Sequence, residues 1–257
     1  MSVPTSAKND RAAWLKGPAA ACARPPGGGG RPWRLVLLGA PGAGKGTQAE
    51  LLAAQLGACH LSTGDVFRAA KELCDCQLSL AMTEALGAMR RGELVSDATV
   101  LAMLRERQGC LSCRGGFLLD GFPRTVPQAQ ALEDLLAEQH VKLDAVISYE
   151  LPIQQLIDRL SGRRTCVKCK AVFHVVTRPP KVPDVCDQCG SALRQREDDR
   201  PESVRVRMET YQRSTAPLIS FYQRLGRLIE VSADGDPAQI LRRTLDALHT
   251  LDAPVKV

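Results

Sequence analysis

Short apolar runs alternate along this chain with longer segments whose apolar residues recur at helical spacing. The first run, residues 35–38, is followed by Ala49, Leu51, Leu52 and Leu56, whose spacing fits one stripe of a helix. Alternation of buried strands with amphipathic helices is typical of a parallel sheet covered by helices on both faces. The sequence therefore predicts an α/β fold with a doubly wound parallel sheet. Three later runs fit further strands: Phe117-Leu118-Leu119, Ala145-Val146-Ile147 and Leu228-Ile229-Glu230-Val231.

The N-terminal segment, residues 1–33, departs from this pattern. It ends in Pro25, Pro26, four glycines and Pro32, a composition that neither propagates a helix nor fills a core. We expect a disordered, basic, Pro/Gly-rich extension. An organelle-targeting segment is the alternative, because the stretch is rich in arginine and poor in acidic residues. Residues 34–250 would then form the folded domain, and residues 251–257 a short tail.

Charge and hydropathy exclude several classes of protein. The formal net charge is +6, but the first 34 residues hold six basic residues and one acidic residue, so the rest of the chain is nearly neutral. A neutral body argues against a general surface for nucleic acid. No apolar run of 18 residues occurs, so neither a membrane span nor secretion is expected. The default is a cytoplasmic protein.

A glycine loop after the first predicted strand carries the first chemical signal. Gly39, four further residues, Gly44 and Lys45 match the phosphate-loop pattern. In such loops backbone N–H groups at a helix N-terminus hold phosphate oxygens, and the lysine reaches the β- and γ-phosphates. A turn used only for packing would not need Lys45. The hydroxyl that usually follows the lysine is displaced by one residue, since Gly46 stands there and Thr47 comes next.

A second signal lies in residues 117–125, where an apolar strand ends in Asp120. Ligands collect at the carboxyl edge of an open parallel sheet, so Asp120 is well placed to hold Mg²⁺ or its waters. The plainer interpretation is a turn carboxylate that caps the next helix. Arg124 follows within a Gly-Phe-Pro-Arg segment and is expected to project into the same crevice.

Together with residues 61–68 (LSTGDVFR), these two segments resemble the adenylate kinase family. The likeness extends in order through residues 92–97, Gln128, residues 158–164, residues 196–207 and residues 215–222. It implies a phosphate-loop core (34–61, 96–161, 200–250) with two mobile inserts. These are a helical insert for the nucleoside monophosphate (62–95) and a small zinc-binding lid (162–199). Both would close over the substrates and exclude water.

The resemblance also implies roles for individual residues. The catalytic set would be Lys45, Asp120, Arg124, Arg163, Arg196 and Arg207. ATP would be bound by Gly42, Ala43, Gly44, Lys45, Gly46, Thr47, Arg159, Arg163, Val172 and Phe173. AMP would be bound by Thr63, Arg68, Glu93, Leu94, Val95, Gly121, Phe122, Pro123, Arg124, Gln128, Arg196 and Arg207. Asp198 and Asp199 resemble an acidic pair that orders the arginines.

The implied activity is reversible, Mg²⁺-dependent transfer between ATP, AMP and ADP, serving adenine nucleotide balance and AMP salvage. Such a reaction needs in-line positioning and charge neutralisation, which convergent arginines and Lys45 supply. A related kinase for UMP or CMP, or one with a GTP donor, is the alternative, although Gln128 and the long lid favour adenylate. A zinc-ribbon protein that binds nucleic acid is disfavoured by the neutral body. We expect a monomer without a nucleic-acid or membrane partner.

Four cysteines give a third, independent signal. Cys166, Cys169, Cys186 and Cys189 follow the pattern C-x2-C-x16-C-x2-C, which lies within the spacing of a four-thiolate zinc site. Four protein ligands leave no open position, so the zinc would be structural. Unligated thiols or two disulfides are the alternatives. The other six cysteines, including Cys74, Cys76, Cys110 and Cys113, are expected to be loop or packing thiols rather than a second metal site or a redox switch.

Overall fold

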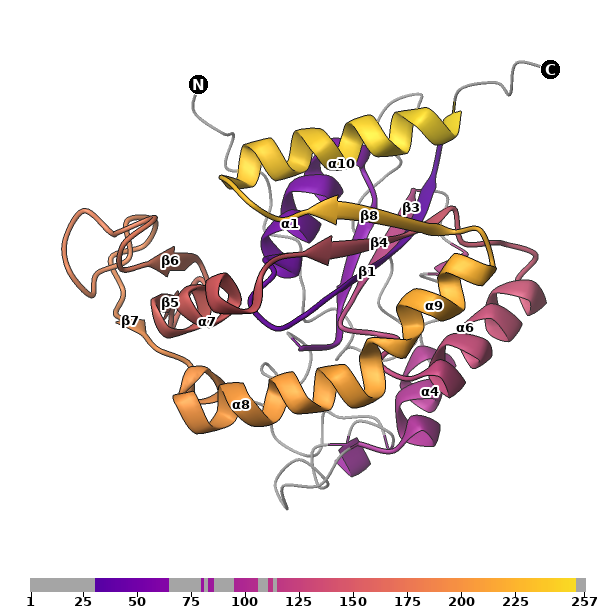
Figure 1. The fold of residues 1–257 in the computed structure, drawn as a ribbon, viewed down its shortest axis with the longest axis horizontal. Helices are drawn as coiled ribbons and strands as arrows, with labels where there is room; N and C mark the ends of the chain where they lie inside the picture. Colours follow the sequence, from indigo (N-terminus) through magenta and orange to yellow (C-terminus); the bar gives the residue numbers. More distant parts are fainter. Residues whose placement is uncertain are drawn as a thin grey trace.

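A five-stranded parallel sheet forms the centre of the molecule in the computed structural model, which describes residues 31–64, 80, 83–85, 95–105, 111–112 and 115–252 (Figure 1). The strand order is β2-β3-β1-β4-β8. The predicted parallel sheet is therefore confirmed. Its strands are β1 (Trp33–Gly39), β2 (Cys59–Ser62), β3 (Gly116–Asp120), β4 (Ala145–Glu150) and β8 (Leu228–Ser232).

Helices cover both faces of this sheet (Figure 1). Alternate residues of β1 point to opposite sides, so Leu35 and Leu37 join one buried cluster while Val36 and Leu38 join the other. The first cluster includes residues of α1 (Lys45–Leu56), α7 (Ile153–Ser161) and α10 (Pro237–Asp252). The second includes residues of α4 (Asp97–Arg105), α6 (Val126–Glu138) and α9 (Pro217–Arg224). Burial on both faces explains why the strands have continuous apolar runs.

The strand order places a crevice at the carboxyl edge of the sheet. From β1 the chain crosses to β2 on one side, whereas from β3 it crosses to β4 on the other side of β1. At such a switch point the loops after neighbouring strands separate and leave room for a ligand. The loop after β1 is the glycine loop, and the loop after β3 contains Arg124. The topology therefore brings the two strongest sequence signals to one site.

A small antiparallel sheet forms the lid at one end of the molecule (Figure 1, left). Its strands β5 (Arg163–Cys166), β6 (Val172–His174) and β7 (Leu193–Arg194) follow α7 in the order β6-β5-β7. The 3-10 turn η3 (Glu197–Asp199), α8 (Pro201–Thr210) and a π-helical turn η4 (Tyr211–Thr215) lead back to α9. Among the described side chains of the lid, the buried apolar cluster consists of Phe173 and Leu193 besides cysteines, with Ala171 at the margin. So small an apolar core needs a further source of stability.

The sheet begins at Trp33, one residue before the boundary that the sequence suggested. The Arg31 guanidinium lies 2.5 Å from Asp144 Oδ1 and 4.4 Å above the Trp33 ring. Asp144 Oδ2 also accepts a hydrogen bond of 2.7 Å from the Arg34 backbone N–H. These contacts tie residues 31–34 to the loop before β4. The predicted extension up to residue 30, most of the insert 62–95 and residues 253–257 lie outside the described residues.

Two observations concern the remaining predictions on membranes and cysteines. Among the helices that the structure describes, none is long and apolar enough to cross a membrane. The prediction that all six cysteines outside the lid are loop or packing thiols is wrong for Cys59, which is disulfide-bonded at the start of β2. This bond could not be predicted from the sequence, because disulfides depend on a spatial approach that the spacing of cysteines does not reveal.

Candidate functional site

The glycine loop joins β1 to α1 at the carboxyl edge of the sheet. Gly39 has a φ of +139°, and a Cβ there would lie 2.7 Å from the Tyr149 carbonyl oxygen, so glycine is required. The loop turns back through a bond from the Ala43 N–H to the Ala40 carbonyl of 3.1 Å. α1 then begins at Lys45. The N–H groups of its first turn have no partner within the helix and point out of its N-terminal end. The segment thus has the strand, glycine turn and helix N-terminus that a phosphate loop requires.

Lys45 folds back onto this loop. Its Nζ donates to the Gly39 carbonyl at 2.6 Å and to the Ala40 carbonyl at 3.0 Å. Desolvation by burial lowers the pKa of Lys45 to about 8; Asp120 opposes this change, and Arg124, Arg207 and Arg163 add to it. These four charged groups therefore lie close enough to act on the ammonium. A phosphate group that enters the loop would replace the two carbonyls as the acceptor of Lys45.

Asp120 supplies the negative charge of this site at the end of β3. One of its oxygens would lie 3.6 Å from a Cβ added at Gly46, so the carboxylate faces the first turn of α1. Its other neighbour is His60, whose Nε2 is 3.6 Å from Oδ2. A carboxylate beside a phosphate loop has the oxygen ligands that Mg²⁺ prefers. Asp120 therefore offers, beside the glycine loop, the type of ligand that a magnesium site needs.

Asp199 holds two of the arginines in position. Arg163 binds it through two hydrogen bonds, Nε to Oδ2 at 2.8 Å and Nη2 to Oδ1 at 2.5 Å. Arg207 Nη1 lies 3.4 Å from Asp199 Oδ1 and 3.0 Å from Asp198 Oδ2. The side chain of Asp199 has no exposed surface, whereas Asp198 is 46% exposed. Asp199 is thus the inner member of the acidic pair and fixes both guanidinium groups.

We expect Asp199→Ala to lower the free energy of unfolding by about 3 kcal/mol, because it leaves two arginines without a buried counter-charge. Glu209→Ala is the matched control, since it removes an exposed partner 3.0 Å from Arg205 and is expected to cost under about 0.5 kcal/mol. Urea unfolding of the three proteins measures both values. Equal losses in the two variants would contradict the role given to Asp199.

Two arginines with different predicted roles lie in different surroundings: Arg159 was predicted to contact ATP, and Arg196 was predicted to contact AMP and the transferring phosphoryl group. Arg159 lies beside the glycine loop, 3.9 Å from a Cβ added at Gly44, and donates to the Ala233 carbonyl at 2.8 Å. Burial lowers its pKa. Arg196 donates instead to Thr165 Oγ1 within the lid at 3.0 Å. Of the β6 pair, Val172 is half-buried and Phe173 is buried in the lid cluster.

On the other side of the crevice, the loop after β3 is fixed at several points. Thr63 Oγ1 donates to the Gly121 carbonyl at 3.0 Å, and Arg124 Nε donates to the same oxygen at 2.8 Å. Gly121 has a φ of +84°, and a Cβ there would lie 2.7 Å from Thr63 Oγ1. Phe122 and Pro123 are buried behind this turn and joined by a cis peptide bond. The exposed guanidinium of Arg124 is therefore presented by a rigid backbone.

Two further contacts hold the backbone of Arg124, and only one could be expected from the sequence. Its N–H donates to Gln128 Oε1 at 2.7 Å, four residues on in α6. Its carbonyl accepts from Thr215 Oγ1 at 3.0 Å, from a residue 91 positions later in the π-helical turn. Val95 lies half-buried against the core. The remaining predicted AMP contacts, Arg68, Glu93 and Leu94, lie outside the described residues.

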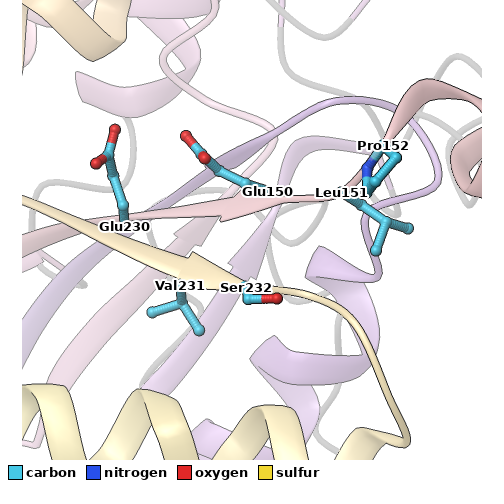
Figure 2. Close-up of a pocket in the computed structure, with 6 residues that line it drawn as sticks. All are labelled: Glu150, Leu151, Pro152, Glu230, Val231 and Ser232. Atoms are coloured by element: carbon cyan, nitrogen blue, oxygen red, sulfur yellow. The ribbon is translucent and has the colours of Figure 1, made fainter.

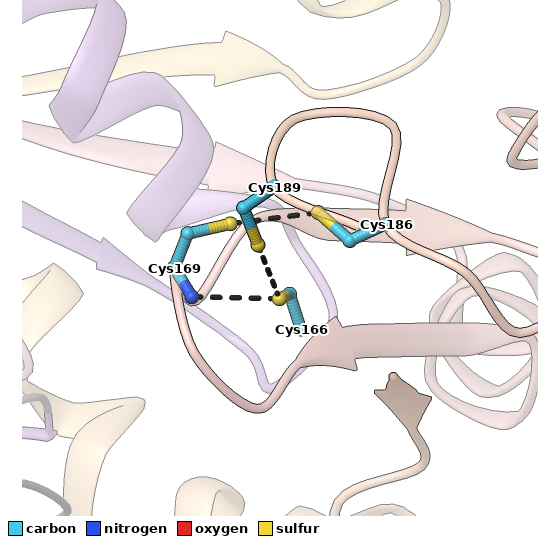
Figure 3. Close-up of side chains that lie close together, drawn as sticks. All are labelled: Cys166, Cys169, Cys186 and Cys189. Carbon is cyan, nitrogen blue, oxygen red and sulfur yellow. Dashed lines mark hydrogen bonds between the residues drawn. The ribbon is translucent and has the colours of Figure 1, made fainter. Parts of the chain in front are cut away.

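The four lid cysteines converge as their spacing predicted (Figure 3). Their sulfur atoms all lie within 4.8 Å of one another, with Cys166 and Cys189 at 3.4 Å and Cys169 and Cys186 at 3.5 Å. The Cys169 N–H points to the Cys166 sulfur at 3.4 Å. Hydrogen bonds from the Ser191 side chain and backbone lower the pKa of Cys189 to about 6. Burial raises the pKa of Cys169 to about 12. The clustering of four sulfur atoms in one small volume is what fits a tetrahedral metal ion.

A separate pocket lies at the ends of β4 and β8, where the Glu150 and Glu230 side chains extend from the same side of neighbouring strands (Figure 2). Burial raises the pKa of Glu150, and the charge and hydrogen bond of Glu230 raise it further. When the pKa of a carboxyl group is higher in the folded than in the unfolded protein, protonation favours folding. This contribution to stability is full below the pKa of the unfolded state and is lost as the pH rises through the pKa of the folded state. At neutral pH the two carboxylates therefore repel each other.

Glu150→Gln should raise the melting temperature by about 2 °C at pH 7, because it removes the repulsion from Glu230. Because its pKa is raised, Glu150 loses its charge sooner than an ordinary glutamate as the pH falls, and the difference from the wild type should shrink at pH 4. Thermal melts of the two proteins at both pH values measure this. A variant that is less stable at pH 7, or equally shifted at both values, would contradict the repulsion.

Comparison with known proteins extends the likeness over most of the chain. A family model described as "Adenylate kinase" matches residues 37–227, which is well over half of the chain. The adenylate kinase of Carboxydothermus hydrogenoformans is 46% identical over 216 residues, covering 84% of this chain and 99% of that relative. That of Acidothermus cellulolyticus is 48% identical over 216 residues, covering 84% and 98%. That of Streptomyces avermitilis is 44% identical over 226 residues, covering 86% and 99%.

Proposed function

The chain belongs to the adenylate kinase family, and on this premise we propose that it catalyses the reversible, Mg²⁺-dependent transfer ATP + AMP = 2 ADP. Such an activity would balance the adenine nucleotides and return AMP to the pool. The observation that supports it most is that the charges of Arg124, Arg163 and Arg207, together with that of Asp120, act on Lys45 of the glycine loop. Together with Lys45, the three arginines provide four positive charges. This number suits a phosphoryl group that is transferred between two bound nucleotides better than it suits a protein that only binds one nucleotide.

The two sides of the crevice suggest separate tasks. The glycine loop and Lys45 would hold the phosphates of ATP, while Arg124 on its rigid turn would hold the phosphate of AMP. Arg163 and Arg207 would approach from the lid side and neutralise the negative charge of the phosphoryl group during its transfer. Asp199 already orients both guanidinium groups. Arg159 would lie against the ATP base, and Arg196 would take part only once the lid has moved. In-line approach of the two substrates then needs no protein nucleophile.

Magnesium fits this site through the oxygen atoms of Asp120 and Thr47. When bound, Mg²⁺ would neutralise phosphate charge and help to orient the ATP phosphates. The chain's own contribution is the carboxylate at the end of β3, which stands next to the first turn of α1.

The lid is proposed to carry a structural zinc ion on Cys166, Cys169, Cys186 and Cys189. The donor set of four sulfurs within 4.8 Å supports this metal, because thiolates select zinc over magnesium or calcium. Zinc would supply the cross-links that the small apolar core of the lid lacks. We further propose that the protein acts as a cytoplasmic monomer and binds no nucleic acid.

A panel of acceptors tests the proposed substrate. The enzyme is incubated with ATP, Mg²⁺ and AMP, UMP, CMP or GMP, and the diphosphates are quantified by chromatography. AMP should be preferred by at least about 100-fold in kcat/KM, because a site that hydrogen-bonds one base rejects those that leave its groups unpaired. GTP in place of ATP tests the donor in the same way. A preference for UMP or CMP would overturn the acceptor assignment.

A further inference from the structure

Asp97 stands at the start of α4, where the chain returns from the insert to the core. Ser96 caps this helix by accepting a bond of 3.1 Å from the Thr99 N–H, so the position of Asp97 is well defined. Its Oδ1 accepts from Gln128 Nε2 at 2.6 Å, and its Oδ2 accepts from Thr125 Oγ1 at 3.2 Å. Both carboxylate oxygens are therefore directed at the first turn of α6.

These contacts fix the orientation of the Gln128 amide. The Arg124 N–H is a donor and must face the amide oxygen, which lies 2.7 Å away. The Asp97 carboxylate is an acceptor and must face the amide nitrogen. Gln128 is only 5% exposed, so a flipped amide would bury a donor against a donor and an acceptor against an acceptor. Asp97 and Arg124 thus hold the amide in one of its two orientations.

We propose that Asp97 is a positioning residue that sets the preference for a 6-aminopurine over a 6-oxopurine acceptor. After its two internal bonds, the Gln128 amide keeps one N–H and one oxygen lone pair in a fixed order. Adenine offers an acceptor at N1 and a donor at N6, whereas hypoxanthine offers the reverse, a donor at N1 and an acceptor at O6. This inference rests on the proposed function, in that Gln128 must contact the acceptor base.

Asp97→Ala is expected to raise KM for AMP about tenfold and to narrow the ratio of kcat/KM for AMP over IMP about tenfold, because the amide becomes free to turn. KM for ATP should change less than about twofold, since the glycine loop lies on the other side of the crevice. Asp97→Asn is the conservative variant. The amide oxygen of this asparagine still accepts from Gln128 Nε2. KM for AMP and the ratio of kcat/KM for AMP over IMP should therefore stay within about threefold of the wild type.

A double-mutant cycle with Gln128→Leu separates the possible failures. If Asp97 acts through Gln128, then Asp97→Ala adds no further loss of AMP over IMP selectivity in the Gln128→Leu background. A Gln128→Leu enzyme with wild-type KM for AMP would overturn the proposed base contact, and this inference with it. If Gln128→Leu raises KM for AMP but Asp97→Ala leaves the AMP over IMP ratio unchanged, Asp97 is only structural and this inference alone fails. An equal rise of KM for ATP and AMP in Asp97→Ala would also overturn it.

Discussion

Lys45→Met should lower kcat/KM by about 10³-fold or more, with the fold retained. Methionine has nearly the same length but cannot donate to a phosphate oxygen. The three nearby arginines are bonded elsewhere, Arg124 to the Gly121 carbonyl and Arg163 and Arg207 to Asp199. Steady-state rates with ATP and AMP measure the loss. Because desolvation of the ammonium already disfavours its charge, the melting temperature of the variant should not fall below that of the wild type.

Lys142→Met is the matched control for this prediction. Lys142 is exposed in the loop before β4, so its removal changes the net charge by the same amount without touching the glycine loop. Its rate should stay within about twofold of the wild type. A Lys45→Met enzyme that keeps more than about a tenth of the activity would contradict the phosphate-binding role of the loop.

The second large effect is expected in the lid, where Cys166→Ser should abolish stable metal binding. Cys166 is buried, and its sulfur lies within 4.8 Å of the other three. Among the described residues no further histidine, cysteine or acidic side chain belongs to this group. Elemental analysis should find one zinc ion per wild-type chain and far less in the variant. The melting temperature should fall by about 10 °C, because metal binding supplies the folding free energy of the lid.

Chelation of the wild-type zinc should reproduce the lower melting temperature of Cys166→Ser, and should have little effect on the variant itself. Cys22→Ser serves as the control for a cysteine outside the cluster, and its zinc content should equal that of the wild type. Equal metal content in Cys166→Ser and the wild type, together with an unchanged melting curve, would show that the four sulfurs hold no structural ion.

The parts of this site that could be predicted from the sequence are those in which a few residues close together in the chain determine the local structure. At Gly39 the close approach of the Tyr149 carbonyl excludes any side chain. The loop therefore requires a glycine at this position, and that glycine can be found in the sequence. Two C-x2-C pairs likewise converge once a hairpin forms between them. The carboxyl-edge position of Asp120 followed from the parallel sheet alone.

Contacts between distant segments could not be predicted, because they depend on how helices pack. Thr215 supports Arg124 only because η4 brings it next to the loop after β3. Asp97 reaches Gln128 only because α4 packs beside α6. Residues of a single motif also separate in space: Arg207 acts on Lys45, while Arg196 binds Thr165 in the lid. No local pattern distinguishes these two arginines.

The most direct measurement of the central proposal uses ADP and Mg²⁺ as the only substrates. Purified enzyme is incubated with both, and ATP and AMP are quantified by chromatography over time. Our account predicts that ATP and AMP form in equal amounts, and that Lys45→Met forms neither at a comparable rate. ADP that stays intact with a folded enzyme, or phosphate released in place of AMP and ATP, would contradict phosphoryl transfer between two adenine nucleotides.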